Sequence, residues 1–98
     1  MKSPNPFTGL TEAQHCKGSY ARNAIGQRVP LNDSSAVRWC AIGAIHRADL
    51  TITERVLFEG WFKRETGTDL AYANDYGRLT FAQFEAAWDR WPSLAVQP

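Results

Sequence analysis

This 98-residue sequence has no long apolar run, no block of like charge and no closely spaced pair of cysteines. No stretch approaches the roughly 18 apolar residues of a membrane-spanning helix, and one lysine without an apolar run behind it does not make the N-terminus a signal peptide. Cys16 and Cys40 do not form a C-x-x-C pair, so we expect two reduced thiols and a cytoplasmic protein.

Charge is also nearly balanced. Eleven Lys and Arg residues stand against ten Asp and Glu residues, for a net charge of +1, and the basic residues are spread evenly along the chain. This distribution lacks the electrostatic footprint of a nucleic-acid-binding or membrane-binding surface. We therefore expect neither nucleic acid nor a membrane as the partner, and nucleic-acid binding stays only as a further alternative.

Signatures of a catalytic or cofactor site are missing as well. The sequence has no phosphate-binding glycine loop, no internal repeat and no carboxylate pair with convincing spacing. Glu54, Glu59 and Glu65 are interpreted as the solvated side of a helix. We expect no cofactor, no metal and no catalytic residue.

Aromatic residues, by contrast, are abundant: they make up 12% of the chain and include four tryptophans. Burying one such ring stabilises the fold by about 1.5–3 kcal/mol before entropy is subtracted. We expect aromatic rings to supply most of the core and a few to be left as surface anchors.

Capping signals and apolar periodicity predict four helices. The Thr11–Gln14 box predicts a helix over about residues 12–24. Four cap-forming residues before Ala36 predict a second helix over about residues 36–49. The box that begins at Thr51 predicts a helix that ends at Gly67, and Thr80 with Gln83 predicts one that Pro92 ends. Residues 68–78 are expected to be a short strand or irregular.

The predicted fold is a single, compact, all-α domain over residues 1–98, with about four helices and a minimal β element near residues 70–76. An extended arm (1–10) and a short tail (93–98) flank it.

The segment 38–48, RWCAIGAIHRA, places a thiol, an imidazole and two guanidinium groups on one predicted helix. Cys40 and His46 would lie about 120° apart around it, out of reach of each other. Mid-helix Gly43 costs close to 1 kcal/mol, which suggests that another group approaches closely there. We interpret the segment as core packing and Cys40 as a buried, inert thiol.

The cysteines have two conceivable chemical uses, zinc binding and thiol catalysis. Zinc binding by His15, Cys16, Cys40 and His46 lacks the spacing of known structural sites. A small thiol-dependent enzyme that uses Cys40 would need a histidine from elsewhere and an orienting group, for which Asn74 or Asp75 is the candidate. This enzyme is kept as the alternative function.

The segment 74–78, NDYGR, is the best candidate for a binding loop. Asn74 and Asp75 fit a turn, and Gly77 is expected to supply a positive φ. Tyrosine and arginine are frequent interface anchors. The predicted binding residues are Asn74, Asp75, Tyr76, Arg78 and Arg47.

Two segments, WCAIGAIHRA (39–48) and ANDYGRLTFAQFEAAWDR (73–90), resemble an uncharacterised family of short bacterial and phage proteins. Its members carry a C-A-x-G-A helix and a later N-D…G-R turn that leads into a terminal helix. The matching residues here are Cys40, Gly43, Ala44, Asn74, Asp75, Gly77, Arg78 and Thr80. Ala73 departs from the family, which usually has tryptophan there. The resemblance implies no activity, but it implies a phage or mobile-element source.

The first functional hypothesis is a small non-enzymatic module that binds a host or self protein through exposed aromatic and arginine side chains. If the gene is carried by a phage, its concrete form is an inhibitor of a host defence system, such as an anti-CRISPR. Self-association into a homo-oligomer stays open.

Overall fold

Four α-helices and one pair of short strands make up the computed structural model, which describes residues 3–48, 50–77 and 79–92. In chain order they are the 3₁₀ helix η1 (Glu12–Gln14), β1 (Ala21–Arg22), β2 (Arg38–Trp39), α1 (Ala41–Arg47), α2 (Ile52–Thr66), α3 (Leu70–Asp75) and α4 (Phe81–Arg90). The chain thus forms a mostly helical small domain.

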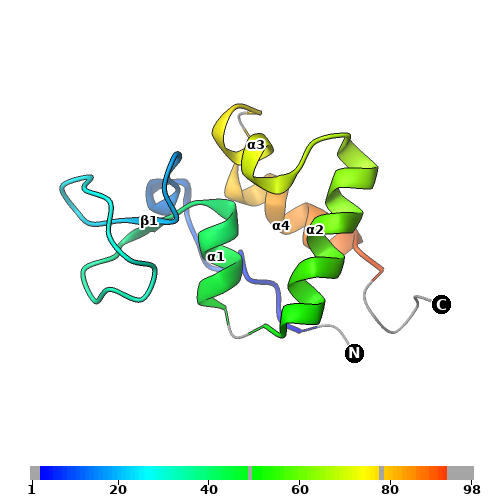
Figure 1. Ribbon diagram of the computed structural model, residues 1–98, viewed down its shortest axis with the longest axis horizontal. Helices are drawn as coiled ribbons and strands as arrows, with labels where there is room; N and C mark the ends of the chain where they lie inside the picture. Colours follow the sequence, from blue (N-terminus) through cyan, green and yellow to red (C-terminus); the bar gives the residue numbers. More distant parts are fainter. Residues whose placement is uncertain (1–2, 49, 78, 93–98) are drawn as a thin grey trace.

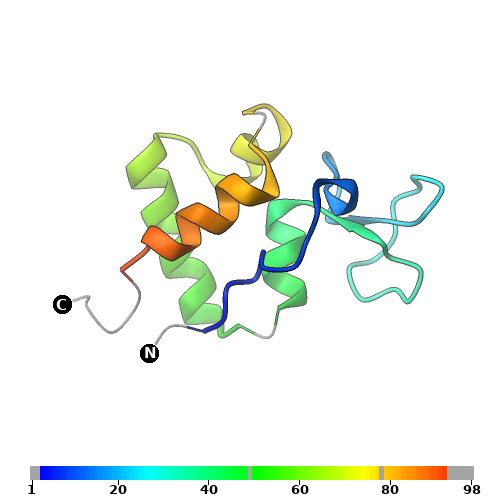
Figure 2. The same cartoon turned by 180° about the vertical axis from the view of Figure 1, so that it is seen from behind.

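The helices form one body, and residues 17–39, here called the lobe, project from it. Figure 1 shows the lobe to one side of α1. Figure 2, the view from behind, shows α4 crossing in front of α2. At the base of the lobe β1 pairs antiparallel with β2, with Ala21 opposite Trp39. An isolated parallel bridge joins Trp39 to His15.

Aromatic rings dominate the core, as predicted. Phe81, Phe84, Trp88 and Trp91 all lie buried along α4. Phe58 of α2 contacts both tryptophans, with ring centroids 5.0 Å from Trp88 and 5.6 Å from Trp91. The large exposed aromatic side chains are three tyrosines rather than tryptophans: Tyr20, Tyr72 and Tyr76.

The N-terminal segment is part of this core rather than a free arm. Phe7 is buried, and its ring stacks on Phe84 at 5.6 Å. Ser3 donates two hydrogen bonds to Glu54, from its backbone N–H at 3.0 Å and from its hydroxyl at 2.6 Å. Glu54 is therefore buried, and its assignment to the solvated side of a helix was wrong.

Two predicted helices have the bounds that their caps indicated. Thr51 accepts a hydrogen bond from the Glu54 N–H, and Gly67 ends α2 in the left-handed conformation with φ 81°. The capping box of Thr80 and Gln83 opens α4, which ends before Pro92.

The prediction for residues 12–24 was wrong: a single 3₁₀ turn follows the Thr11–Gln14 box. The chain leaves this turn at His15, and the Cys16 N–H donates to the Trp39 carbonyl, 3.0 Å away. Gly18, with φ 73°, then turns the chain into the lobe. The helix predicted over 36–49 begins five residues later, at Ala41, because Arg38 and Trp39 pair with β1.

Residues 70–76 are not the predicted β element. They hold α3, whose first turn is capped by Asp69 through a 2.8 Å hydrogen bond from the Tyr72 N–H. The strands lie instead at the base of the lobe. Gly77 has no positive φ; a Cβ there would lie 2.8 Å from the Ala73 carbonyl oxygen.

Gly43 is required by the close approach of the lobe to α1. A Cβ at this position would overlap the carbonyl oxygen of Tyr20 and lie 3.0 Å from its carbon. The prediction that another group approaches this glycine closely is confirmed, and the group is the backbone of Tyr20. Among the described residues, no helix has the length and apolar character needed to cross a membrane.

Replacing Gly43 with alanine should lower the free energy of unfolding by about 3 kcal/mol or more, because the backbone clash outweighs the roughly 1 kcal/mol gained in helix propensity. Gly60→Ala is the matched control. Its added Cβ would meet only the flexible Arg64 side chain at 3.5 Å, so we expect a gain of about 0.5–1 kcal/mol. Urea denaturation of both variants measures this difference, and equal effects would contradict the assigned contact.

Candidate functional site: a pocket between the lobe and α3

Asn74 and Asp75 lie at the C-terminal end of α3, beside the base of the lobe, and Tyr76 follows them as the C-cap. Tyr76 is exposed, and its ring lies 5.1 Å from that of Tyr72. The predicted residue Arg78 lies outside the described residues. The structure thus brings three of the five predicted binding residues together.

Arg47 is not part of this group. It ends α1, about 9 Å along the helix axis from Ala41, the α1 residue that Asn74 contacts. Its guanidinium carbon lies 4.5 Å from the centroid of the Trp39 ring, a cation–π contact.

Asn74 is buried, with 1% of its surface exposed, and its amide links three parts of the chain. Its Oδ1 accepts from the Ala41 N–H at 2.9 Å, at the N-terminus of α1. Its Nδ2 donates to the Cys16 carbonyl at 3.1 Å and to Asp75 Oδ1 at 2.9 Å. These partners leave only one orientation of the amide that satisfies every bond.

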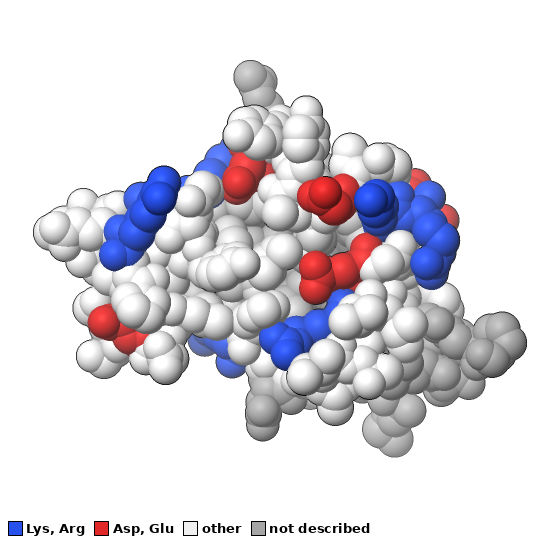
Figure 3. All heavy atoms as spheres, in the orientation of Figure 1, with Lys and Arg blue, Asp and Glu red and all other residues white. Residues whose placement is uncertain are grey.

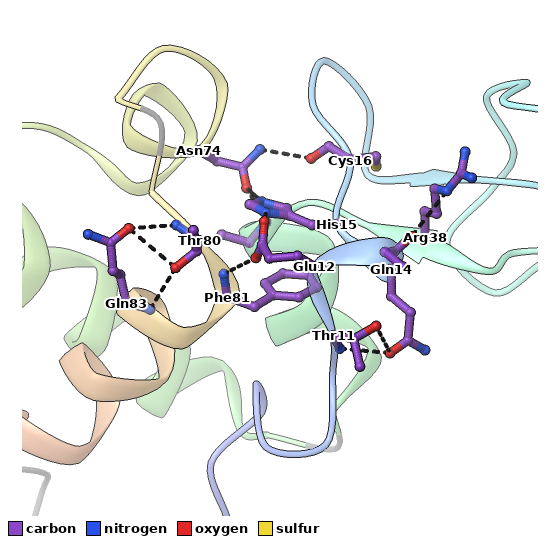
Figure 4. Close-up of polar contacts among 12 residues, drawn as sticks. Thr11, Glu12, Gln14, His15, Cys16, Arg38, Asn74, Thr80, Phe81 and Gln83 are labelled. Carbon is purple, nitrogen blue, oxygen red and sulfur yellow. Dashed lines mark hydrogen bonds and ion pairs between the residues drawn. The ribbon is translucent and has the colours of Figure 1, made fainter.

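That orientation places a proton on the Nε2 of His15. The His15 Nε2 lies 2.5 Å from Asn74 Oδ1, an acceptor, and its Nδ1 lies 3.1 Å from a carboxylate oxygen of Glu12 (Figure 4). The Nε2 therefore donates to Asn74, while the Nδ1 faces the Glu12 carboxylate. The side chain of His15 is 5% exposed, whereas that of Glu12 is 52% exposed.

Glu12 also binds the N-terminus of α4, where it accepts a hydrogen bond from the Phe81 N–H. Partial burial raises the pKa of Glu12, but the hydrogen bonds from Phe81 and His15 and the charge of His15 outweigh it and hold the pKa below its ordinary value. The His15 ring stacks on Phe81 with centroids 4.3 Å apart. One network thus joins η1, α3 and the first residues of α1 and α4.

A pocket of about 370 Å³ opens beside this network. Its three walls come from the lobe, from the start of α1 and from α3. The lining residues are Gly18, Ser19, Tyr20, Arg28, Cys40, Ile42, Ala71, Asn74 and Asp75. A pocket of this volume accommodates one small ligand or one side chain of a partner.

Two opposite charges in the pocket walls are available to a ligand. Asp75 uses Oδ1 to accept from the Gly18 N–H at 3.0 Å and from Asn74. Its second carboxylate oxygen, and the guanidinium of Arg28, make no hydrogen bond or ion pair with any of the described residues. The pocket therefore offers one acceptor and one donor.

Cys40 lines the pocket but is poorly suited to nucleophilic attack. It is 7% exposed, and its Sγ accepts the Gly43 N–H at 3.2 Å as the N-cap of α1. Burial raises the pKa of the Cys40 thiol, despite hydrogen bonds to the sulfur that favour the thiolate. His15 is engaged by Glu12 and Asn74 and makes no hydrogen bond to this sulfur.

The residues that sequence reasoning missed are Glu12, His15, Tyr20 and Arg28. His15 was considered only as a zinc ligand, and among the described residues no three His, Cys, Asp or Glu side chains converge on a point that could hold a metal ion. A usable signal was the pairing of the C-A-x-G-A and N-D segments, which meet where Asn74 binds Ala41.

Asn74→Ala should cost about 3 kcal/mol or more of stability, because it leaves the Ala41 N–H, the Cys16 carbonyl and the His15 Nε2–H without partners at about 1–3 kcal/mol each. Asn32, exposed in the lobe, provides the control, and Asn32→Ala should stay within about 0.5 kcal/mol of wild type. Urea denaturation measures both. A small loss at Asn74 would show that the network does not hold the helices together.

Glu12 should make stability depend on pH in the acid range. Its pKa is lower in the folded than in the unfolded chain, so its contribution is fully present above its ordinary value of 4.5 and disappears as the pH falls through the folded value. The stability difference between wild type and Glu12→Gln should therefore shrink on acidification. Glu65→Gln, at an exposed position on α2, should show no such trend. Denaturation series at several pH values test this, and a difference that grows on acidification would contradict the assigned ion pair.

No protein-family model, curated protein or solved structure matches this chain. The resemblance of residues 39–48 and 73–90 to a phage and bacterial family therefore stays a hypothesis, and function has to be argued from the site itself.

Proposed function

We propose that this chain is a protein-interaction module that receives a side chain of its partner in the pocket between the lobe and α3. The observation that carries the proposal is the pocket of about 370 Å³ whose walls hold one carboxylate oxygen of Asp75 and the guanidinium of Arg28, neither of which binds another of the described residues. Charged groups that no other side chain occupies can pair with a donor and an acceptor of a ligand.

Three exposed tyrosines, one of which lines the pocket, support a protein partner. Tyr20 lines the pocket and is 59% exposed, while Tyr72 and Tyr76 are 55% and 72% exposed on α3. Tyr72 follows the lining residue Ala71, and Tyr76 follows Asp75. Tyrosine is enriched at interface hot spots because it provides a large contact area and a polar group at low entropic cost.

The charge distribution favours protein over nucleic acid. On the face shown in Figure 3, basic side chains form separate groups with acidic side chains between them. A phosphate backbone requires a contiguous basic surface, whereas a protein partner can match mixed charges. The inserted group would carry a donor toward Asp75 and an acceptor toward Arg28.

An inhibitor of a host defence system is the concrete form we propose if the gene is carried by a phage. Inhibition of this kind needs only tight, specific contact with a host protein, and no catalytic group. Three exposed tyrosines and a charged pocket supply the residue types for such contact.

Site-specific photocrosslinking in cells that naturally encode the protein tests the proposal. A benzophenone amino acid at Tyr20 or Tyr72 should give a covalent adduct of one defined mass, identified by mass spectrometry. The same probe at Lys63, exposed on α2 and no part of the pocket, should not. Reversing the pocket charge by Arg28→Glu should reduce the adduct at Tyr72 several-fold.

Absence of any adduct at the tyrosines, or equal adducts at Lys63, would refute the proposed surface. Cys40→Ser separates this function from the alternative, a thiol-dependent enzyme. An interaction module keeps its adducts in that variant, whereas an enzyme that uses Cys40 loses its activity.

A further inference from the structure

Cys16 and Cys40 stand at the two ends of the lobe, where the chain leaves the helical body and returns to it. The 23 residues between them include β1 and β2, and Figures 1 and 2 show this segment projecting from the helices. The two cysteines thus mark the neck of the lobe.

A backbone hydrogen bond places the two cysteines beside each other. His15 and Trp39 form a parallel bridge, and the Cys16 N–H donates to the Trp39 carbonyl at 3.0 Å. The bridge is isolated, but Cys40 directly follows the Trp39 carbonyl, so this hydrogen bond brings the backbone of Cys16 beside that of Cys40. Paired chains lie about 4.8 Å apart. Disulfides join residues with Cα atoms about 4.4–6.8 Å apart.

Neither thiol is part of a disulfide, and each cysteine has 7% of its surface exposed. The Cys40 Sγ accepts the Gly43 N–H at 3.2 Å. Burial raises the pKa of Cys16, and the neighbouring Cys40 raises it further. The Cys16 Sγ donates only a 3.5 Å hydrogen bond, to the Ser19 carbonyl, which is weak and easily given up.

We infer that Cys16 and Cys40 are a disulfide site, at which a low-molecular-weight disulfide such as oxidised glutathione closes the neck of the lobe. The oxidant reaches Cys40 first because Cys40 lines the pocket and Cys16 does not, and the reaction is slow because the Cys40 thiol is buried and caps α1. The Cys40 thiolate attacks one sulfur of the oxidant, forms a mixed disulfide and releases one thiolate. The Cys16 thiolate then attacks the Cys40 sulfur and releases the second. The protein loses two electrons and two protons, and the oxidant becomes two thiols.

A disulfide between Cys16 and Cys40 would restrict the movement of the pocket walls relative to each other. Gly18, Ser19, Tyr20 and Arg28 belong to the lobe, while Ala71, Asn74 and Asp75 belong to α3. A disulfide at the base of the lobe fixes the pocket wall formed by the lobe relative to the helical body, which carries the pocket wall formed by α3. The disulfide site itself does not depend on the proposed protein-binding function.

Oxidised glutathione and the folded full-length protein provide the test. Intact-mass analysis should show a monomer that has lost two hydrogen atoms, and peptide mapping without reduction should link Cys16 to Cys40. The equilibrium constant for closure, measured against glutathione buffers, should be at least tenfold larger in the folded protein than in urea. The oxidised protein should also unfold at a higher temperature than the reduced one.

Cys16→Ser and Cys40→Ser serve as matched controls, since neither can close the neck and neither should show a redox-dependent unfolding temperature. Disulfide-linked dimers, stable glutathione adducts on wild type, unreacted thiols, or equal closure in folded and unfolded chains would each overturn the inference. If both variants fail to fold, the equilibrium constants for disulfide formation in folded and in urea-unfolded wild type still test the inference.

Discussion

The hydrogen bonds of one buried amide, that of Asn74, hold the helices and the lobe in their relative positions. Asn74 binds Ala41 at the start of α1, the carbonyl of Cys16 and the ring of His15, residues that lie 33 to 59 positions away along the chain. Inside a protein an unpaired amide or imidazole N–H is far more costly than a paired one. Each of these partners therefore depends on the others being in place, and the arrangement is all-or-none.

The same network explains how the charged pocket is supported. The Glu12 carboxylate contacts the ring of His15 and also caps α4, and Asn74 orients Asp75 through its amide nitrogen. Asp75 in turn holds the Gly18 N–H in the lobe. One wall of the pocket is thus positioned by the buried Asn74 and its hydrogen bonds, and supporting contacts of this kind make a binding surface rigid.

Local signals in the sequence predicted α2 and α4 because caps, apolar spacing and terminating residues agree there. They failed at residues 12–24 and 36–40, where the Cys16 N–H and the strand pair Arg38–Trp39 bind distant backbone, a constraint that no local window contains. The glycine at position 43 was correctly assigned to a close contact, although its partner, Tyr20, was not identifiable. Asn74 and Asp75 were recognised by residue type, while Arg28 and Tyr20 reach the pocket only through the fold.

The separation of the lobe from the aromatic core has an evolutionary consequence. Of residues 17–39, only Trp39 packs against the core cluster, and it does so while partly exposed. Substitutions and insertions near the outer turns of the lobe leave the core intact, since the entropic cost of a longer loop rises only slowly with its length. New specificity can therefore arise in this segment at little risk to folding, as it does in antibody loops carried on a constant framework.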